Sequence, residues 1–177
     1  MKRRLFAKRF GKDSRGVAAV EFAFIASAVG FVMLNVGDLA LFFFDQLEVE
    51  NATQMGAQAA YATCPFANLP ATVNCSGLNT AITAAVQSTS LSTAATVVTG
   101  YPTEAYYCVN SSGVLTSVGA VSSAKPADCT AVGSSSTKPG DYLQVQVTFT
   151  YAPLFSGASI AALLPTTISN TAWVRLS

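Results

Sequence analysis

The sequence predicts an α+β protein in which a long membrane-spanning N-terminal helix is followed by a small head with an antiparallel sheet, a short helix and two disulfides. An apolar run near the N-terminus is long enough to cross a bilayer, apolar and polar residues alternate over 142–151, and four cysteines lie beyond the run. Only 11% of the residues are charged, against about 25% in a typical soluble domain. Much of the surface must therefore face lipid, other subunits or weakly charged surroundings.

The apolar run occupies the 21 residues 17–37 and contains one ionisable residue, Glu21. A helix of this length crosses the hydrocarbon core of a bilayer, which is about 30 Å thick. Asp38 follows the run, and the stretch "LALFFF" comes directly after it at 39–44. This stretch predicts that the helix continues through the outer interface with an aromatic band near the headgroups.

Residues 46–63 continue the helical pattern with a different composition. Small apolar residues recur at spacings of three or four, and polar residues follow another side of the same helix. The apolar positions are Ala52, Met55, Ala59 and Ala62, and the polar ones are Glu50, Gln54 and Gln58. We therefore expect one helix from about residue 17 to 63, with an apolar stripe that packs on the chain's own head or on a partner.

Charge is distributed unevenly along the chain. Residues 1–16 hold seven of the ten Lys and Arg, whereas residues 17–177 hold three bases and eight acids. A basic segment beside an apolar span marks its cytoplasmic end, so the head should lie across the membrane, and we expect no nucleic-acid partner. Histidine is absent from the sequence, which excludes His-dependent triads and most zinc sites. We expect no metal and no cofactor.

Glu21 needs a partner, because a carboxylate near the end of a spanning helix costs a few kcal/mol when it is unpaired. If the peptide bond after Gly16 is cut, Val17 acquires a free ammonium group one helical turn from Glu21. Either this amine or that of a neighbouring helix would then neutralise the carboxylate. The second arrangement would favour side-by-side association of helices in register.

The basic leader, the sequence "GVAAVEF" at 16–22 and the apolar helix resemble the processing site of type IV prepilins. The pair Glu21 and Phe22 is typical of the tight-adherence (Tad, or Flp) branch of that family. The resemblance implies that a membrane-embedded prepilin peptidase cuts between Gly16 and Val17 on the cytoplasmic side. Glycine before the cut suits an active site that needs backbone with no side chain in the way.

The chain is longer than the small major pilin of that system and is similar to the TadE-like minor pseudopilins, in which a globular domain follows the helix. The stretches "GDYLQVQVTFTYAPL" (140–154) and "TTISNTAWVRLS" (166–177) resemble the closing strand pair of those proteins. This implies a leader at 1–16, a helix at 17–63 and a head at 64–177. It also implies a structural, non-enzymatic role in assembling a Tad/Flp-type pilus for adhesion or secretion.

The resemblance further implies partners and a location. Other pilin or pseudopilin subunits would contact the N-terminal helix, and the prepilin peptidase would act on the leader. The protein would cross the bacterial inner membrane once, with its N-terminus in the cytoplasm and its head in the periplasm, and would enter an extracellular pilus if it is incorporated.

The basic tail and apolar run are also compatible with two other kinds of N-terminal segment. A secretory signal peptide cut after Ala26-Ser27-Ala28 would leave a mature chain that still begins with a membrane-like apolar stretch. The main alternative is an uncleaved signal anchor that carries a cell-envelope binding or adhesin domain. A hydrolase would need a general base, and the acids of the head, Glu104, Asp128 and Asp141, form no recognisable arrangement.

In the head, the cysteines permit three pairings. The simplest joins Cys64 to Cys75 and Cys108 to Cys129, because each bond closes a short loop rich in Pro, Gly or Ser. Metal binding by the cysteines is disfavoured because no pair has C-x2-C spacing. The periodicities predict a helix at 78–89, strands at 94–100, 104–109, 114–121, 142–151 and 168–176, and a hairpin turn at 110–113.

Overall fold

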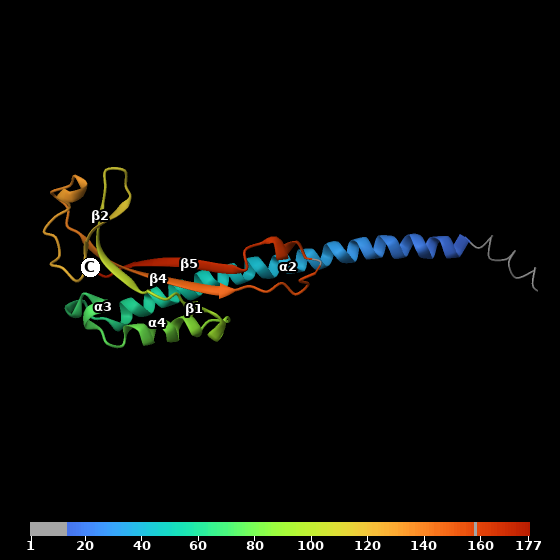
Figure 1. The fold of residues 1–177 in the computed structure, drawn as a ribbon, viewed down its shortest axis with the longest axis horizontal. Coiled ribbons are helices and arrows are strands. Elements are labelled where there is room, and N and C mark those ends of the chain that lie inside the picture. Colours follow the sequence, from blue (N-terminus) through green and yellow to red (C-terminus); the bar gives the residue numbers. More distant parts are fainter. Residues whose placement is uncertain (1–13, 158) are drawn as a thin grey trace, which may run out of the picture. The chain divides into compact units, whose positions relative to one another are not determined.

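The computed structural model describes residues 14–157 and 159–177, so most of the predicted leader lies outside the described residues. It confirms the predicted fold class: a long N-terminal helix, an antiparallel sheet, short helices and two disulfides (Figure 1). The helices are α2 (Ser14–Thr63), α3 (Ala71–Asn74) and α4 (Leu78–Gln87), with short 3-10 turns η1 (Phe66–Asn68), η2 (Ser92–Ala94), η3 (Thr130–Val132) and η4 (Ile160–Leu163). The strands are β1 (Thr96–Val97), β2 (Thr103–Val109), β3 (Leu115–Ala120), β4 (Gly140–Thr150) and β5 (Thr167–Arg175).

Helix α2 is uninterrupted from Ser14 to Thr63, as the sequence predicts for 17–63. No proline lies within it, and most of its apolar residues are good helix formers. The helix ends two residues before Pro65, which disfavours helical backbone at the residue that precedes it.

The chain divides into two compact units. One contains α2 up to Leu41 together with the segment Pro153–Leu164, and the other contains Phe42–Ala152 and Pro165–Ser177. Helix α2 contributes to both units, so the boundary of compact packing falls inside the helix. The segment Pro153–Leu164 connects β4 to β5 and is called the β4–β5 loop below.

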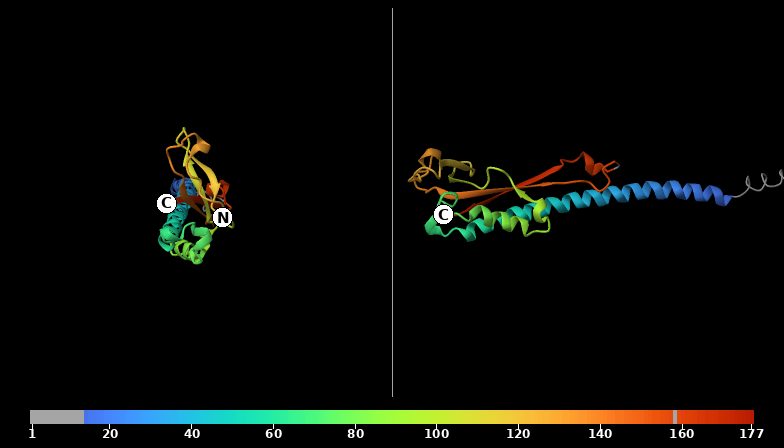
Figure 2. Two further views of the ribbon diagram at one scale, coloured as in Figure 1. Left: turned by 90° about the vertical axis from the view of Figure 1, so that its left-hand side faces the viewer. Right: turned by 60° about the horizontal axis from the view of Figure 1, so that its bottom comes forward.

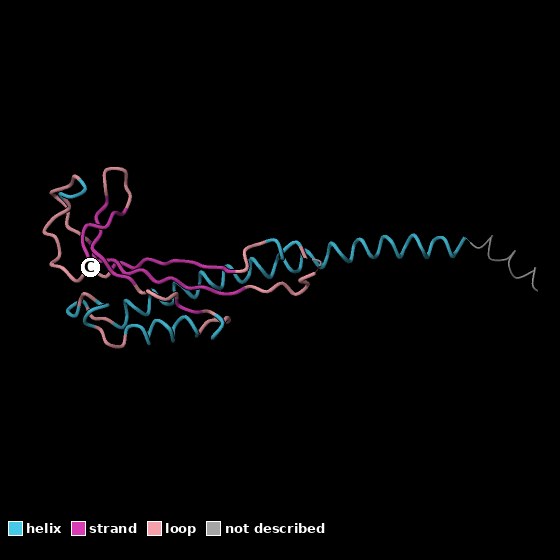
Figure 3. Tube along the Cα trace, viewed as in Figure 1, coloured by secondary structure: helices cyan, strands magenta, loops and turns pink. Residues whose placement is uncertain are grey.

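The sheet is organised around β4. Among the described residues, five strands form one antiparallel sheet, and β5 pairs with β4 along one edge from Thr150↔Thr167 to Tyr142↔Arg175 (Figures 2 and 3). The other edge of β4 is shared, because β2 pairs with its first half and β1 with its second half. β3 extends the sheet beyond β2. The predicted pairing of the last two strands is confirmed.

The strand predicted at 94–100 is much shorter in the structure. Only Thr96 and Val97 form β1, which pairs with Thr148 and Val147 on the edge of β4 that β2 occupies over Gly140–Gln144. The backbone also turns on both sides of β1, at η2 and at Gly100, whose φ of 96° lies in the left-handed region. The hairpin turn predicted at 110–113 is confirmed.

The core of the larger unit lies between the sheet and two helices. The inward face of β4 is fully buried at Leu143, Val145 and Val147, which confirms the alternation in the sequence. In α4 the buried residues are Leu78, Ile82 and Val86, as the helical spacing predicts. Figures 1 and 2 show α4 lying alongside the C-terminal half of α2.

The buried face of α2 differs from the predicted stripe. Ala52 is buried as expected, but Met55 and Ala62 are exposed. The residues that contact the core are Val49, Ala52, Thr53, Gly56, Ala57 and Ala60. The contact is centred on Gly56, which the predicted apolar stripe did not include. A Cβ at that position would lie 3.0 Å from Val86 Cγ2 and 3.3 Å from Val145 Cγ1.

We predict that Gly56→Val destabilises the head by about 1–3 kcal/mol, because added methyl groups must displace well-packed neighbours. Thermal unfolding followed by near-ultraviolet circular dichroism of the detergent-solubilised protein measures the change. Gln58→Val, at an exposed position two residues along α2, controls for the cost of a β-branched residue in a helix. Equal melting temperatures for the two variants would contradict the close approach at Gly56.

Candidate functional site

The first half of α2 presents an extensive apolar surface. Among the described residues, one helix is long and apolar enough to cross a membrane, and its most apolar window has a mean hydropathy of 2.2 and no buried residues. The large exposed side chains between 17 and 36 are Val17, Val20, Phe22, Phe24, Ile25, Val29, Phe31, Val32, Met33, Leu34 and Val36. A surface of this kind does not face water in a stable protein and belongs in lipid or against other apolar helices.

The predicted processing residues lie at the start of this surface. Gly16 and Val17 are exposed in the first turn that the structure describes in full, and no heavy atom lies within 4 Å of a Cβ built on Gly16. Glu21 and Phe22 are exposed one turn further along, and Phe22 is 72% exposed. The helix thus presents all four residues on accessible surface. The cleavage and the role of Glu21 stay predictions.

Two polar residues of α2, to which the sequence pattern assigned no role, bind the β4–β5 loop. Asp38 is fully buried, and its Oδ1 and Oδ2 accept hydrogen bonds from the backbone N–H groups of Leu154 (2.9 Å) and Phe155 (3.4 Å). Asn35 is 6% exposed, and its Oδ1 accepts a hydrogen bond from the N–H group of Ile160 (2.7 Å). The loop is therefore held to the helix through its backbone.

The sequence contained a signal for this contact. Asn35 and Asp38 are three residues apart, so they lie on one face of a helix that is otherwise largely apolar from Phe22 to Gly37. Polar residues within an apolar span are expected to have partners. The partner was not predictable, because the loop is more than 110 residues away along the chain.

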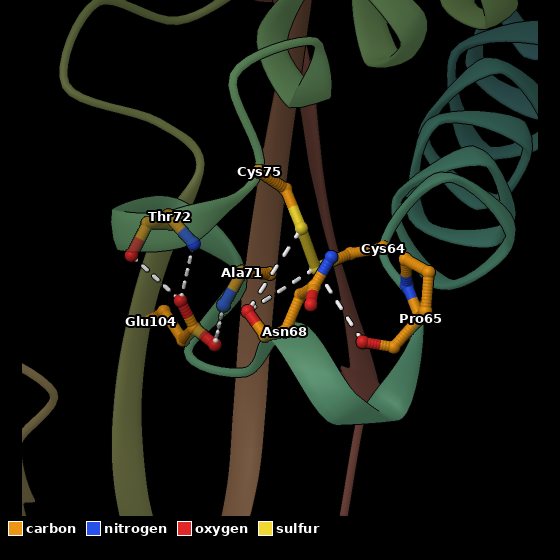
Figure 4. Close-up of a disulfide and its surroundings, with 7 residues drawn as sticks. All are labelled: Cys64, Pro65, Asn68, Ala71, Thr72, Cys75 and Glu104. Carbon is orange, nitrogen blue, oxygen red and sulfur yellow. Dashed lines mark hydrogen bonds between the residues drawn. A yellow bond between two sulfur atoms is a disulfide. The ribbon is translucent and has the colours of Figure 1, made fainter.

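A disulfide closes a loop at the end of α2, and a carboxylate connects this loop to the sheet. Cys64 is bonded to Cys75, and Cys108 to Cys129, which are the pairings that the short loops predict. Figure 4 shows Glu104 of β2 reaching the loop closed by the first bond. Its oxygens accept hydrogen bonds from Ala71 N (2.8 Å), Thr72 N (2.6 Å) and Thr72 Oγ1 (2.6 Å).

A second carboxyl group lies near Glu104 in the folded head. Asp141 is the inward-facing residue at the start of β4 and is 2% exposed, and its Oδ1 has no hydrogen-bond partner among the described residues. Burial, and then the repulsion and hydrogen bonding of the Glu104 carboxylate, raise the pKa of Asp141 to about 7, against a smaller opposing effect of Lys125. Burial and the same two acids also raise the pKa of Tyr106.

This carboxyl pair suits a structural role better than a catalytic one. Asp141 is out of reach of a substrate, and both oxygens of Glu104 are occupied by the loop between Cys64 and Cys75. In the sequence, the acids of the head form no recognisable arrangement. The structure brings Glu104 and Asp141 together because they lie on neighbouring strands, where Glu104 pairs with Leu143 and Tyr106 with Asp141.

We predict that Asp38→Ala loosens the β4–β5 loop, because the buried N–H groups of Leu154 and Phe155 lose their acceptor at a cost of about 1–3 kcal/mol. Hydrogen–deuterium exchange of the protein in lipid nanodiscs should become faster in peptides that cover 153–164. Asp38→Asn, which keeps one carbonyl oxygen, should have a smaller effect. Gln58→Ala is the matched control on an exposed face of the same helix, and exchange in Asp38→Ala as slow as in this control would contradict the contact.

We predict a pH-dependent effect of Asp141→Asn. Because the pKa of Asp141 is raised from 3.8 to about 7, the folded state binds more protons than the unfolded state between these values, and the free energy of unfolding falls as pH rises through them. Asparagine stays neutral, so near pH 8 the variant should be more stable than the wild type by an amount on the order of 1–3 kcal/mol, and near pH 4 about equally stable. Denaturant unfolding at several pH values measures this.

Asp128→Asn is the control for the titration experiment. Hydrogen bonds from Thr130 lower the pKa of Asp128, so removing this carboxyl should give no gain in stability at alkaline pH. A gain of Asp141→Asn that is the same at all pH values would contradict the raised pKa.

A comparison with known protein families gives a match that lies within α2. Residues 16–58 match the family of TadE-like proteins. The match begins at Gly16, includes Glu21, Phe22, Asn35 and Asp38, and ends within α2. No curated protein and no solved structure matches the chain. Over this helix the chain is similar to TadE-like proteins, which confirms the predicted resemblance.

Proposed function

We propose that the protein is a minor pseudopilin that acts structurally in the assembly of a Tad/Flp-type pilus and is processed by a prepilin peptidase after Gly16. The observation that carries this proposal is the exposed apolar surface of α2, which begins at Val17, directly after Gly16, inside the TadE-like segment. Before assembly this surface would face lipid. In a filament this surface would pack on the equivalent surfaces of other pilin subunits. Burial of the apolar side chains between subunits would favour assembly.

Glu21 has a specific role in this proposal. It is exposed on α2 one helical turn beyond Val17, where an ammonium group created by cleavage would neutralise it. A carboxylate near the N-terminus of the shortened helix also interacts favourably with the helix dipole. Pairing with the amine of a neighbouring subunit would set the register between helices. Because cleavage creates this amine, the pairing would be possible only after processing.

The topology follows from the charge asymmetry and the cysteines. Basic residues that precede α2 favour a cytoplasmic N-terminus, and the head would then lie in the periplasm or outside the cell. Both disulfides are in the head, which is consistent with an oxidising compartment. We propose a single pass through the bacterial inner membrane, with the prepilin peptidase and other pilin subunits as partners.

A second candidate function is an uncleaved signal anchor that carries a cell-envelope binding domain. It is favoured by the sheet face opposite the helices, where the ring of Tyr107 contacts those of Tyr142 and Trp173 at centroid distances of 5.8 and 5.1 Å. An open cavity of about 560 Å³ lies beside Tyr107 and Tyr142 and is also lined by Lys138 and Arg175. Aromatic and polar groups around a hollow are typical of ligand-binding surfaces.

Processing distinguishes the two functions. We predict that Gly16→Val blocks removal of the leader when the protein is expressed in its host or together with a Tad prepilin peptidase, because a branched side chain would enter the narrow site that accepts glycine. The measurement is the mobility of the protein on a gel together with N-terminal sequencing. The wild type should begin at Val17 and the variant at Met1.

Glu21→Ala is the matched variant, since it changes the same segment without changing the residue before the cut. It should be cleaved like the wild type but should reduce pilus assembly, measured as the amount of pilus in a sheared fraction. A wild-type protein that begins at Met1 would support the signal anchor instead, and one that begins at Val29 would support a secretory signal peptide.

A further inference from the structure

The β4–β5 loop is unusually apolar for a connection between two strands. Its large side chains point outward: Leu163 is 85% exposed, Leu154 69%, Ile160 54% and Phe155 40%. The sequence from 142 to 174 contains no charged residue. Surface loops are ordinarily polar because water surrounds them, so a cluster of exposed apolar side chains indicates a non-aqueous neighbour.

The contacts with α2 fix the height of this loop along the membrane-spanning helix. At about 1.5 Å per residue, Asn35 lies about 27 Å and Asp38 about 32 Å along the helix axis from Val17. The hydrocarbon core of a bilayer is about 30 Å thick. If the core begins near Val17, the N–H groups bound by Asn35 and Asp38 lie at its outer boundary. The loop is therefore held at the depth where acyl chains meet headgroups.

Several backbone N–H groups of the loop have acceptors within the protein, as a position near hydrocarbon requires. Besides the three N–H groups bound by α2, Ser159 N donates to Phe155 O (2.9 Å) and Ala161 N to Ser159 Oγ (3.0 Å). Ala162 N donates to Ser159 O (3.2 Å), and Leu164 N to Ala161 O (3.1 Å). Backbone groups near hydrocarbon must find partners within the protein because water is scarce there. These bonds hold part of the loop backbone within the protein, while the large apolar side chains of the loop are exposed.

We propose that the β4–β5 loop inserts into the outer leaflet of the membrane that α2 crosses, so that its side chains contact phospholipid acyl chains and the inner edge of the headgroups. This inference rests on α2 spanning the membrane. Asn35 and Asp38 act as its positioning residues, since they hold the loop against the helix at a defined depth. The protein then contacts the bilayer through two segments, and the second is too short to cross it.

Lipid is favoured over a neighbouring subunit as the occupant for two reasons. The loop surface is continuous in composition and position with the apolar surface of α2, whose large side chains at 31–36 are also exposed. Its lack of charge suits the boundary of the hydrocarbon, where ionised groups are costly. A protein partner of matching shape is the alternative that the experiment must exclude.

Fluorescence quenching by brominated lipids tests the insertion in the full chain. Trp173 is first replaced by Phe to remove the tryptophan of the wild type, and single tryptophans are then placed in separate variants. Leu163→Trp reports on the loop, Phe31→Trp on the helix and Ser112→Trp on the β2–β3 hairpin. All three positions are exposed, so the fold should tolerate the changes, and mass spectrometry of the two disulfides checks this.

The proteins are reconstituted in phosphatidylcholine vesicles brominated either near the ester end or near the methyl end of the acyl chains. We expect strong loss of Leu163→Trp fluorescence with bromine near the ester end and weaker loss with bromine near the methyl end, because the loop lies at the boundary of the core. Phe31→Trp should be quenched in both lipids. Ser112→Trp should be quenched in neither and should instead respond to acrylamide in the water phase.

The outcomes separate this inference from the proposed membrane anchoring. If Phe31→Trp is quenched while Leu163→Trp behaves like Ser112→Trp, the loop insertion is overturned and the anchoring stands. If Phe31→Trp is not quenched, α2 does not span the bilayer and both fail. A Leu163→Trp signal that neither brominated lipid nor acrylamide reduces would place the loop against another subunit, and this also overturns the proposal.

Discussion

A backbone N–H group that is removed from water must find its acceptor within the protein, and the smaller unit of this structure depends on that constraint. Asn35 and Asp38 interrupt the apolar surface of α2, yet both are buried because they accept hydrogen bonds from the β4–β5 loop. Without these bonds the three N–H groups would lose their acceptors, and the two side chains of α2 would lose their backbone donors. Each segment therefore satisfies the polar groups of the other.

Carboxylates serve as structural acceptors in the larger unit as well. Cys64 and Cys75 close a loop at the end of α2, and Glu104 of β2 connects this loop to the sheet through charge-assisted hydrogen bonds. Asp141 lies nearby with a raised pKa. Glu104 and Asp128 thus accept hydrogen bonds from backbone N–H groups of the loops, whereas Asp141 is buried in β4.

Much of the fold was predictable because it follows from local periodicity. The extent of α2, the buried residues of α4 and the alternation in β4 each depend on spacing within one element. The length of β1 was not predictable, because the backbone turns at η2 and at Gly100 on either side of it. The predicted apolar stripe of α2 included Met55 and Ala62, which are exposed in the structure. The sequence does not reveal that α4 and β4 approach the helix closely at Gly56. The partner of Asp38 depends on tertiary contact and was beyond sequence reasoning.

The position of the β4–β5 loop in the chain affects how a protease could separate the head from the first half of α2. Loops are the usual sites of nicking, but a cut in this loop would leave the head attached through α2. The severed β5 would also remain hydrogen-bonded to β4 from Thr167 to Arg175. Separating the larger unit would require a cut in α2 itself, and helical backbone must unwind to enter a protease.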